Sequence, residues 1–272
     1  MKALITGHKG YIGGQLFNTL SSRGIDVKGV DLKNGEDVLE CLPNEGYDYV
    51  FHLSALPRVG YSVEYPSYTL KQNVLVTSKL LEWSKDHGVK RFVFSSSSAA
   101  AGDGDGPTSP YGLHKLMSEM ECKLYSDLYG LDTVCLRYFN VFSKDQQYGG
   151  AYSTVICAWA EMVKQKEPLR IDGDGEQTRD YIHVKDVVAA NVHCMNHKEN
   201  FNGKCFDVGT GVSISVNDIK KIVEKYHKVV WDSAPPRRGD AKHTRANIGD
   251  LKNKGWCAKI DSLVAIEECF KI

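Results

Sequence analysis

The sequence has no excess of either charge and no long apolar segment. Lys and Arg together number 34, and so do Asp and Glu, so the chain of 272 residues has a formal net charge of zero. A balanced chain produces no field that would attract nucleic acid or an anionic membrane. No apolar run approaches the roughly 18–20 residues that span a bilayer. We therefore expect neither nucleic acid nor a membrane as a partner.

The eight cysteines contain no Cys-x-x-Cys pair, and most stand in apolar runs such as Val134-Cys135-Leu136. This distribution predicts buried free thiols and excludes a disulfide framework or a zinc site. The segment Met1–Gly7 reaches glycine too early for the apolar core of a signal peptide. We therefore expect a cytoplasmic protein without a bound metal.

Short apolar runs alternate with longer amphipathic stretches in the first half of the chain. The expected strands are 3–6, 27–30, 49–53, 91–95 and 133–137. The expected helices are 15–22, 73–87, 110–129 and 184–195. This alternation predicts an α/β fold with a Rossmann-type doubly wound parallel sheet. The segment between Asp31 and Asp48 is too short for a further strand and helix, so we expect a trimmed sheet edge there.

The pattern changes after Arg137, where glycine and proline pairs separate shorter elements. This change predicts a smaller α/β domain interleaved with the first. We expect residues 1–140 and about 184–208 to form the first domain. Residues of about 141–183 and 209–272 form the second.

Gly7, Gly10 and Gly13 are spaced as Gly-x-x-Gly-x-x-Gly between the first expected strand and its helix. Glycine permits a tight turn and close approach to a pyrophosphate, which the helix N-terminus then faces. Asp31 ends the second strand, where an acid binds ribose hydroxyls and repels a 2′-phosphate. Each feature has a local alternative, an ordinary turn or a strand-end Asp. Together they predict that the first domain binds NAD.

Tyr111 and Lys115 stand at positions i and i+4 near a helix start, which puts both on one helix face. A nearby ammonium favours the phenolate, so Tyr111 could take a proton from a substrate hydroxyl. Taken alone, the pair could equally be a surface Tyr and Lys. A strand that runs into Ser95-Ser96-Ser97-Ser98 favours catalysis, because ligands bind at the carboxyl ends of such strands.

Further motifs occur in one order along nearly the whole chain. After the glycine loop come His52-Leu53-Ser54-Ala55, Asn73-Val74, the serine run, Tyr-x-x-x-Lys, Arg137-Tyr138-Phe139-Asn140-Val141, Thr178-Arg179-Asp180-Tyr181-Ile182, Asp207-Val208-Gly209-Thr210-Gly211 and Arg237-Arg238-Gly239-Asp240. In this order they resemble the extended short-chain dehydrogenase/reductase family, specifically its nucleotide-sugar epimerase/dehydratase branch. Each motif alone is common, and the ordered set is specific.

The resemblance implies a role for each matching residue. It makes Ser97, Tyr111 and Lys115 the catalytic residues and the second domain the substrate-binding one. The implied NAD contacts are Gly7, Gly10, Tyr11, Ile12, Gly13, Asp31, Asp37, Val38, Leu53, Ser54, Ala55, Asn73, Tyr111, Lys115 and Tyr138. The implied substrate contacts are Ser97, Asn140, Arg179, Tyr181, Val216, Arg237 and Asp240.

The two arginines suit a diphosphate, because a guanidinium presents a planar fork to phosphate oxygens. The local alternative for Arg179 is a salt bridge with Asp180. For Arg237 it is a solvated pair with Arg238.

The residues after Ser97 separate the branches of the family. The related 4,6-dehydratases carry Asp-Glu there, the UDP-glucuronate decarboxylases a Glu, and the fucose-type epimerase/reductases a Cys. This chain has Ser98-Ala99-Ala100. It thus resembles the UDP-glucose and UDP-N-acetylglucosamine 4-epimerases, which oxidise C4 to a 4-keto sugar and reduce it from the other face. We expect a UDP-sugar as substrate.

Two alternatives stay open: a nucleotide-sugar reductase or dehydratase of the same family, and a non-catalytic NAD-binding sensor or scaffold. The presence of both Tyr111 and Lys115 favours an enzyme. The stretch Gly102–Pro110 is shorter than the matching loop of most 4-epimerases, so the sugar is not specified. The resemblance also implies a homodimer through the helices around Asn73–His87 and Tyr111–Tyr129.

Overall fold

The computed structural model describes residues 1–102, 104–149, 153–236 and 242–272. The chain separates into two compact units that are interleaved along the sequence. The first comprises Met1–Tyr138 and Val187–Asp207, and the second Phe139–Asp186 and Val208–Ile272. These bounds lie close to those of the two predicted domains, whose binding roles stay predictions.

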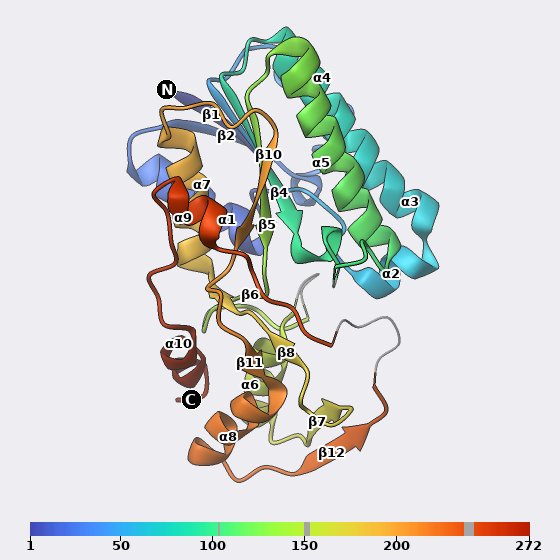
Figure 1. Cartoon of the computed structure of the whole chain (residues 1–272), viewed down its shortest axis with the longest axis vertical. Helices are drawn as coiled ribbons and strands as arrows, with labels where there is room; N and C mark the ends of the chain where they lie inside the picture. The colour runs from blue at the N-terminus through green and yellow to red at the C-terminus, as the bar shows by residue number, and fades with distance from the viewer. Residues whose placement is uncertain (103, 150–152, 237–241) are drawn as a thin grey trace. The chain divides into compact units, whose positions relative to one another are not determined.

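A six-stranded sheet forms the centre of the first unit, in the order β10-β5-β4-β3-β1-β2. The strands are β1 (Lys2–Thr6), β2 (Asp26–Val30), β3 (Tyr49–His52), β4 (Arg91–Ser97), β5 (Thr133–Tyr138) and β10 (Lys204–Val208). Neighbouring strands from β2 to β5 pair in parallel. The sheet lies between α1 (Tyr11–Ser22) and α7 (Val184–Asn196) on one side and α4 (Val76–Asp86) and α5 (Pro110–Tyr129) on the other (Figure 1). The predicted doubly wound fold is confirmed.

The strands of the first unit read as continuous apolar runs because helices cover both faces of the sheet. Leu4, Phe51, Phe92 and Phe94 are each fully buried. Burying one such side chain contributes roughly 1.5–3 kcal/mol. This core holds the carboxyl ends of the strands in place.

Two predicted helix boundaries were wrong. The first helix begins at Tyr11 instead of Gln15, because Gly13 lies inside its first turn, where a Cβ would come 2.1 Å from the Gly7 carbonyl oxygen. The helix expected from Asn73 is preceded by a π-helical turn, Lys71–Leu75, and α4 starts at Val76. The trimmed edge is confirmed: β2 ends the sheet, and the fully described segment between β2 and β3 contains one 3₁₀ turn, Leu32–Asn34, and no other helix or strand.

Local sequence signals explain the bounds of α5. Ser109 caps its N-terminus by accepting a hydrogen bond from the Gly112 N–H (3.2 Å), and Pro110 occupies the first turn. Gly130 ends the helix in a left-handed conformation with φ of 69°. The predicted range 110–129 is confirmed.

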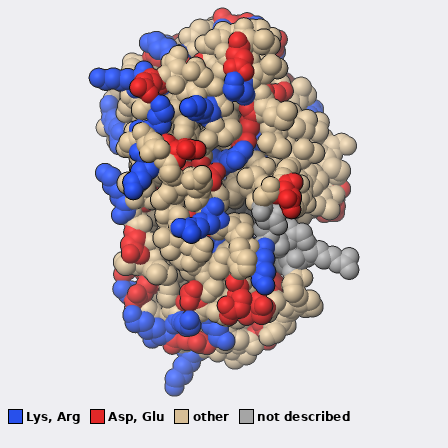
Figure 2. Space-filling view, in the orientation of Figure 1, with Lys and Arg blue, Asp and Glu red and all other residues tan. Residues whose placement is uncertain are grey.

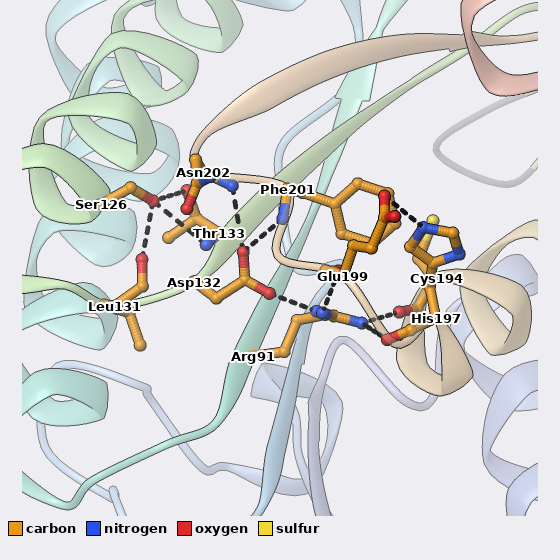
Figure 3. Close-up of polar contacts among 10 residues, drawn as sticks. All are labelled: Arg91, Ser126, Leu131, Asp132, Thr133, Cys194, His197, Glu199, Phe201 and Asn202. Atoms are coloured by element: carbon orange, nitrogen blue, oxygen red, sulfur yellow. Dashed lines mark hydrogen bonds and ion pairs between the residues drawn. The ribbon is translucent and has the colours of Figure 1, made fainter. Parts of the chain in front are cut away.

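A buried ion pair attaches the segment after α7 to the sheet (Figure 3). Arg91 at the start of β4 pairs with Asp132 and donates to the carbonyl oxygens of Cys194, His197 and Glu199. The Asp132 carboxylate also accepts from the N–H groups of the Phe201–Asn202 segment (2.7 and 3.0 Å). The guanidinium therefore satisfies the Cys194 carbonyl in the last turn of α7 and two carbonyls of the segment that follows the helix.

Two short helices, α2 (Val59–Glu64) and α3 (Pro66–Leu70), and the 3₁₀ turn Ser98–Ala100 complete the first unit. The described part of the second unit contains three strand pairs: β6 (Val141–Phe142) with β9 (Ile182–His183), β7 (Leu169–Asp172) with β12 (Trp231–Ala234), and β8 (Thr178–Arg179) with β11 (Ile214–Ser215). Its helices are α6 (Val155–Gln165), α8 (Val216–Tyr226), α9 (Gly249–Asn253) and α10 (Ser262–Cys269). An apolar cluster that includes Phe142, Trp159 and Phe270 forms the core of this unit.

All eight cysteines are free thiols. Cys41 and Cys257 are exposed, so the prediction of burial was wrong for these two. Within the described ranges, no helix combines the length and apolarity that crossing a membrane would require. The described side chains also include no cluster of three or more potential metal ligands. Lys and Arg are interspersed with Asp and Glu on the face drawn in Figure 2.

Candidate active site

The predicted site residues of the first unit gather at one edge of its sheet. Paired strands bring Thr6 opposite Val30 and His52, and Ser97 opposite Tyr138. Because these strands are parallel, their carboxyl ends meet at the same edge. The glycine loop, Asp31, Leu53 and the serine run therefore begin beside one another although they are far apart in sequence.

The glycine loop leaves no room for side chains where it turns. Gly7 has φ of 76°, and a Cβ there would come 2.7 Å from the Ser54 nitrogen. The Gly10 N–H donates to the Gly7 carbonyl (2.9 Å), which closes the turn. Gly10 is the N-cap of α1, and it has no side chain that could occupy the space before the helix N-terminus.

Asp31 lies directly beside this loop. Its carboxylate accepts hydrogen bonds from the main-chain N–H groups of Lys9 (2.8 Å) and Lys33 (2.9 Å). The side chain is buried. A carboxylate has about four acceptor positions, so two bonds leave capacity for ribose hydroxyls.

Asp37 and Val38 were predicted to contact adenine. The Asp37 carboxylate accepts from the Leu39 N–H (2.9 Å), which forms a local turn. The Val38 side chain is buried in the core cluster with Leu4 and Val30. This burial leaves the main chain as the part of Val38 that could contact a cofactor.

Asn73 holds the segment after β3. Its side-chain oxygen accepts from the Leu56 N–H (2.7 Å), and its amide donates to the Leu56 carbonyl (3.2 Å). Leu53, Ser54 and Ala55, the predicted cofactor groove, are half-buried. Both polar groups of the Asn73 side chain thus bind this segment, which the motif alone did not predict.

Ser97 and Tyr111 stand at the adjoining ends of β4 and α5. The Ser97 hydroxyl oxygen accepts from the Ala99 N–H (3.2 Å), so its own hydrogen is the group it can donate. A Cβ at Gly112 would lie 2.4 Å from the Ala99 carbonyl oxygen, so only glycine lets α5 approach this turn so closely. The Tyr111 N–H donates to the Ser62 hydroxyl (3.0 Å), which ties the start of α5 to α2.

Lys115 points into the interior beneath the serine run. Its Nζ donates to the Ser95 carbonyl (2.7 Å) and lies 4.7 Å from the centroid of the Phe94 ring. Only 4% of the residue is exposed. Burial lowers the pKa of the ammonium to about 8, and the nearby Glu119 carboxylate opposes this shift. The predicted shared face of Tyr111 and Lys115 is confirmed, because both side chains are buried.

Glu119 was missed at the sequence level. Its carboxylate accepts from the Ser96 hydroxyl (2.5 Å) and forms a two-pronged ion pair with Arg137 (2.8 and 2.6 Å). The hydrogen bonds to Glu119 raise the pKa of the Arg137 guanidinium. The sequence contained one signal for this contact. Glu119 follows Lys115 by one helical turn, and an arginine stands at the end of a neighbouring strand. The contact joins α5 to β4 and β5.

The Tyr138 hydroxyl belongs to an interior network. It lies 2.9 Å from the Ser95 hydroxyl and accepts from the Asn191 amide on α7 (2.8 Å). Burial raises the pKa of this phenol to about 12. The phenol is therefore neutral, and the NAD contact of Tyr138 stays a prediction.

The second unit contains Asn140 and Arg179. The Asn140 amide donates to the Asp180 carbonyl (2.8 Å), and the Arg179 guanidinium donates to the carbonyls of Thr178 (2.8 Å) and Lys242 (3.2 Å). Asp180 is fully buried, and its carboxylate accepts from the Thr210, Gly211 and Ala246 N–H groups (2.9, 2.7 and 3.2 Å). Asp180 therefore organises the Gly209–Gly211 loop.

Tyr181 and Val216 were predicted to line the substrate site, and this role stays a prediction. Tyr181 is 2% exposed and Val216 7% exposed, and both belong to the core of the second unit. Their motifs are apolar at these positions because they pack against Phe142 and Ile214. Arg237 and Asp240, predicted to bind the diphosphate and ribose, lie outside the described residues.

The residues of the first unit fit NAD. The loop at Gly7 has space for main chain only, which suits a pyrophosphate, and an acid stands beside it. This arrangement matches a dinucleotide with an unmodified 2′-hydroxyl. Lys115 and the serine run lie at the same sheet edge, where chemistry on a bound substrate could occur.

Comparisons with known proteins agree with this geometry. The profile of the NAD dependent epimerase/dehydratase family matches residues 3–209. A putative UDP-glucose 4-epimerase of Methanocaldococcus jannaschii is 31% identical, and the match covers 95% of this chain and 93% of that protein. A UDP-glucose 4-epimerase of Corynebacterium glutamicum is 29% identical over 98% and 94% of the two chains.

Solved structures resemble the chain over its whole length. The crystal structure of a Thermotoga maritima UDP-glucose 4-epimerase with UDP-glucose has a TM-score of 0.88 and 30% identity, covering 100% of this chain and 98% of that one. A Bacillus cereus UDP-glucuronic acid 4-epimerase in complex with UDP-glucuronic acid and NAD has a TM-score of 0.88 and 27% identity, covering 100% and 99%. The named sugars differ between these relatives.

Proposed function

This chain belongs to the NAD-dependent epimerase/dehydratase family, and from that premise we infer that it interconverts the C4 epimers of a nucleotide sugar with NAD as cofactor. The relatives named above are UDP-sugar 4-epimerases that match nearly the full chain. The observation that carries the reaction type is the buried Lys115 beneath the serine run, on the same helix face as Tyr111. No acid stands directly after Ser97, where the run is Ser98–Ala101 and a water-eliminating relative would carry one.

The catalytic roles belong to Ser97, Tyr111 and Lys115. When bound, NAD would accept a hydride from C4 of the sugar and return it to the opposite face. Tyr111 takes the proton of the C4 hydroxyl and later gives it back. The Lys115 ammonium favours the phenolate form of Tyr111 by its charge. The Ser97 hydroxyl donates a hydrogen bond to the reacting oxygen, which becomes a ketone oxygen in the 4-keto sugar.

The substrate is a UDP-sugar in our proposal, because UDP-sugars are named for each relative above. Arg179 and Arg237 would hold its diphosphate and Asp240 its ribose. The 4-keto sugar must rotate in the site between the two hydride transfers while its nucleotide stays bound. The first unit is the NAD-binding domain and the second the substrate-binding domain in this proposal. The eight free thiols suit the reducing cytoplasm that we propose for it.

We also propose a homodimer. Four apolar residues on the outer face of α5 are exposed at helical spacing: Leu113, Met120, Leu124 and Leu128. Such a stripe on a helix is typical of a surface that packs against another helix. Replacing Met120 and Leu124 by Glu should convert a dimer to a monomer in light scattering coupled to size-exclusion chromatography. A monomeric wild-type protein would refute the proposal.

A deuterium label tests the reaction itself. Each member of a panel of UDP-, GDP- and dTDP-sugars with deuterium at C4 is incubated with the protein, and the products are followed by proton NMR and mass spectrometry. We expect the 4-epimer with the label still at C4, because the hydride returns to the same carbon. Net conversion of NAD to NADH would mean net oxidation of the sugar and would refute the epimerase. Loss of water would favour a dehydratase.

A matched pair of variants tests whether the protein is a catalyst. Tyr111→Phe removes the phenolic proton acceptor and should lower kcat by roughly 10²–10⁴-fold. Tyr129→Phe makes the same change at the exposed end of the same helix and should leave kcat unchanged. Equal turnover by the two variants would contradict the assignment of Tyr111, and no turnover of the whole panel by wild type would favour an NAD-binding sensor.

A further inference from the structure

In the first unit, side-chain hydrogen bonds and the main chain of Leu53–Leu56 together form a closed ring. At one end of this segment, the main-chain N–H and the hydroxyl of Ser54 donate to Thr6 Oγ1 (3.3 and 3.1 Å). At the other end, Leu56 exchanges two hydrogen bonds with the Asn73 side chain (2.7 and 3.2 Å). The segment is therefore held at both ends by side chains from β1 and the π-helical turn.

One imidazole joins these two ends. His52 Nδ1 lies 2.7 Å from Thr6 Oγ1, and Nε2 lies 2.9 Å from Thr77 Oγ1. The Thr77 hydroxyl in turn donates to the Asn73 carbonyl (2.7 Å). His52, Thr6, Thr77 and Asn73 are all at most 3% exposed. The ring thus runs through the interior, from the end of β1 to the start of α4.

The hydrogen bonds assign the tautomer of His52. A threonine hydroxyl has a single hydrogen, and that of Thr77 goes to the Asn73 carbonyl. Thr77 Oγ1 must then accept from His52, so the ring hydrogen is on Nε2. Nδ1 of the neutral ring is an acceptor, and it takes the hydrogen of Thr6. Burial, together with the charge of Lys115, lowers the pKa of His52 to about 3, so the ring is neutral at physiological pH.

We propose that His52 is a positioning residue for the NAD groove, which its Nε2–H tautomer shapes by holding the Leu53–Leu56 main chain against the glycine loop. The two segments already touch, since a Cβ at Gly7 would come 2.7 Å from the Ser54 nitrogen and 2.9 Å from the Leu53 carbonyl carbon. A drift of this segment would therefore change the shape of the groove. The inference rests on the proposed NAD site and adds residues that touch no ligand.

Thr77 provides a matched pair of variants. Thr77→Val keeps the shape of the side chain but removes the hydroxyl, whereas Thr77→Ser keeps the hydroxyl. With cofactor removed beforehand, isothermal calorimetry should give an NAD dissociation constant raised roughly tenfold in Thr77→Val, which leaves His52 Nε2–H unsatisfied. Thr77→Ser should bind NAD like wild type. Circular dichroism spectra verify that both variants are folded.

Thr6→Val opens the same ring on the other side of His52. If the groove depends on a closed ring, removing a second hydroxyl from a ring that is already open should weaken NAD binding little further. The double variant Thr6→Val/Thr77→Val should then raise the NAD dissociation constant by much less than the product of the two single effects. If the effects of the two single substitutions on the dissociation constant multiply instead, the claim that the ring acts as one unit is overturned.

A spectroscopic measurement on wild type removes the dependence on variants. The ¹⁵N chemical shifts of His52 in histidine-labelled protein distinguish a protonated ring nitrogen from a bare one. We expect protonated Nε2 and bare Nδ1, and the reverse would overturn the assignment even if Thr77→Val fails to fold. Wild type that binds no NAD would refute the proposed function. Wild type and a folded Thr77→Val with equal NAD affinity would refute only the role of His52.

Discussion

Replacing Lys115 by methionine should stabilise the fold while it removes activity. The ammonium is 4% exposed, and burial lowers its pKa to about 8 from the usual 10.5. The folded protein therefore contains a desolvated charge that a methionine of similar length would not have. In the proposed mechanism catalysis needs this charge beside Tyr111, so the same substitution should abolish turnover.

The magnitude follows from the two pKa values. One pKa unit corresponds to about 1.4 kcal/mol, so a pKa lowered from 10.5 to about 8 means that wild type is less stable by roughly 3 kcal/mol at pH 7. Lys115→Met also loses the hydrogen bond from Nζ to the Ser95 carbonyl, and this loss offsets about 1–2 kcal/mol of the gain in stability. The free energy of unfolding of Lys115→Met should therefore exceed that of wild type by roughly 1–2 kcal/mol.

The pH dependence isolates the charge from the hydrogen bond. Between about pH 8 and 10.5 the unfolded chain binds a proton at Lys115 that the folded chain has lost, so wild-type stability rises with pH there. Below pH 8 both states are protonated and the penalty is constant. The free energy of unfolding of Lys115→Met relative to that of wild type should therefore fall by roughly 2–3 kcal/mol between pH 7 and pH 10.

Urea unfolding of the cofactor-free proteins at pH 7, 8, 9 and 10 measures this difference. Lys123→Met is the control, because this lysine lies on the same helix and is 52% exposed. Its stability should stay within about 0.5 kcal/mol of wild type at each pH. A difference between Lys115→Met and wild type that does not change with pH would refute the reasoning.

Three further predictions concern the cofactor, the fold and the catalytic turn. Asp31→Ser should raise the ratio of NADP to NAD affinity at least roughly tenfold in calorimetric titrations, because a carboxylate no longer repels the 2′-phosphate; an unchanged ratio would contradict the site. Arg91→Met should lower the free energy of unfolding by about 3–5 kcal/mol, since it leaves the buried Asp132 carboxylate without its cation, and hydrogen exchange should accelerate at the end of α7. Gly112→Ala should lower kcat and cost about 1–3 kcal/mol in thermal unfolding, because its Cβ would meet the Ala99 carbonyl. Gly60→Ala, whose Cβ meets nothing within 4 Å, should be neutral or stabilising.

Much of the fold could be predicted from the sequence because its signals are local. Ser109, Pro110 and Gly130 mark the ends of α5 through capping and backbone conformation. The apolar strands and the amphipathic helices between them predicted the parallel sheet. The start of α1 was missed because glycine usually disfavours a helix, whereas here Gly13 is needed where the helix passes the glycine loop.

Residues whose role depends on distant partners required the tertiary structure. Tyr181 and Val216 lie in motifs that also fit a ligand site, and only packing showed that their side chains belong to a core. Glu119 binds Ser96 and Arg137 on two strands, and the spacing of Glu119 after Lys115 in α5 does not by itself identify these partners.

The Tyr111–Lys115 pair was readable from its spacing, because helical geometry alone puts positions i and i+4 on one face. The sequence by itself thus determined the fold class, the position of the glycine loop and this pair. The closed ring around His52 joins Thr6, 46 positions earlier, to Thr77, 25 positions later. Only the register of β1 against β3 and the packing of α4 bring these groups together, so the tertiary structure decided that they form one hydrogen-bonded ring.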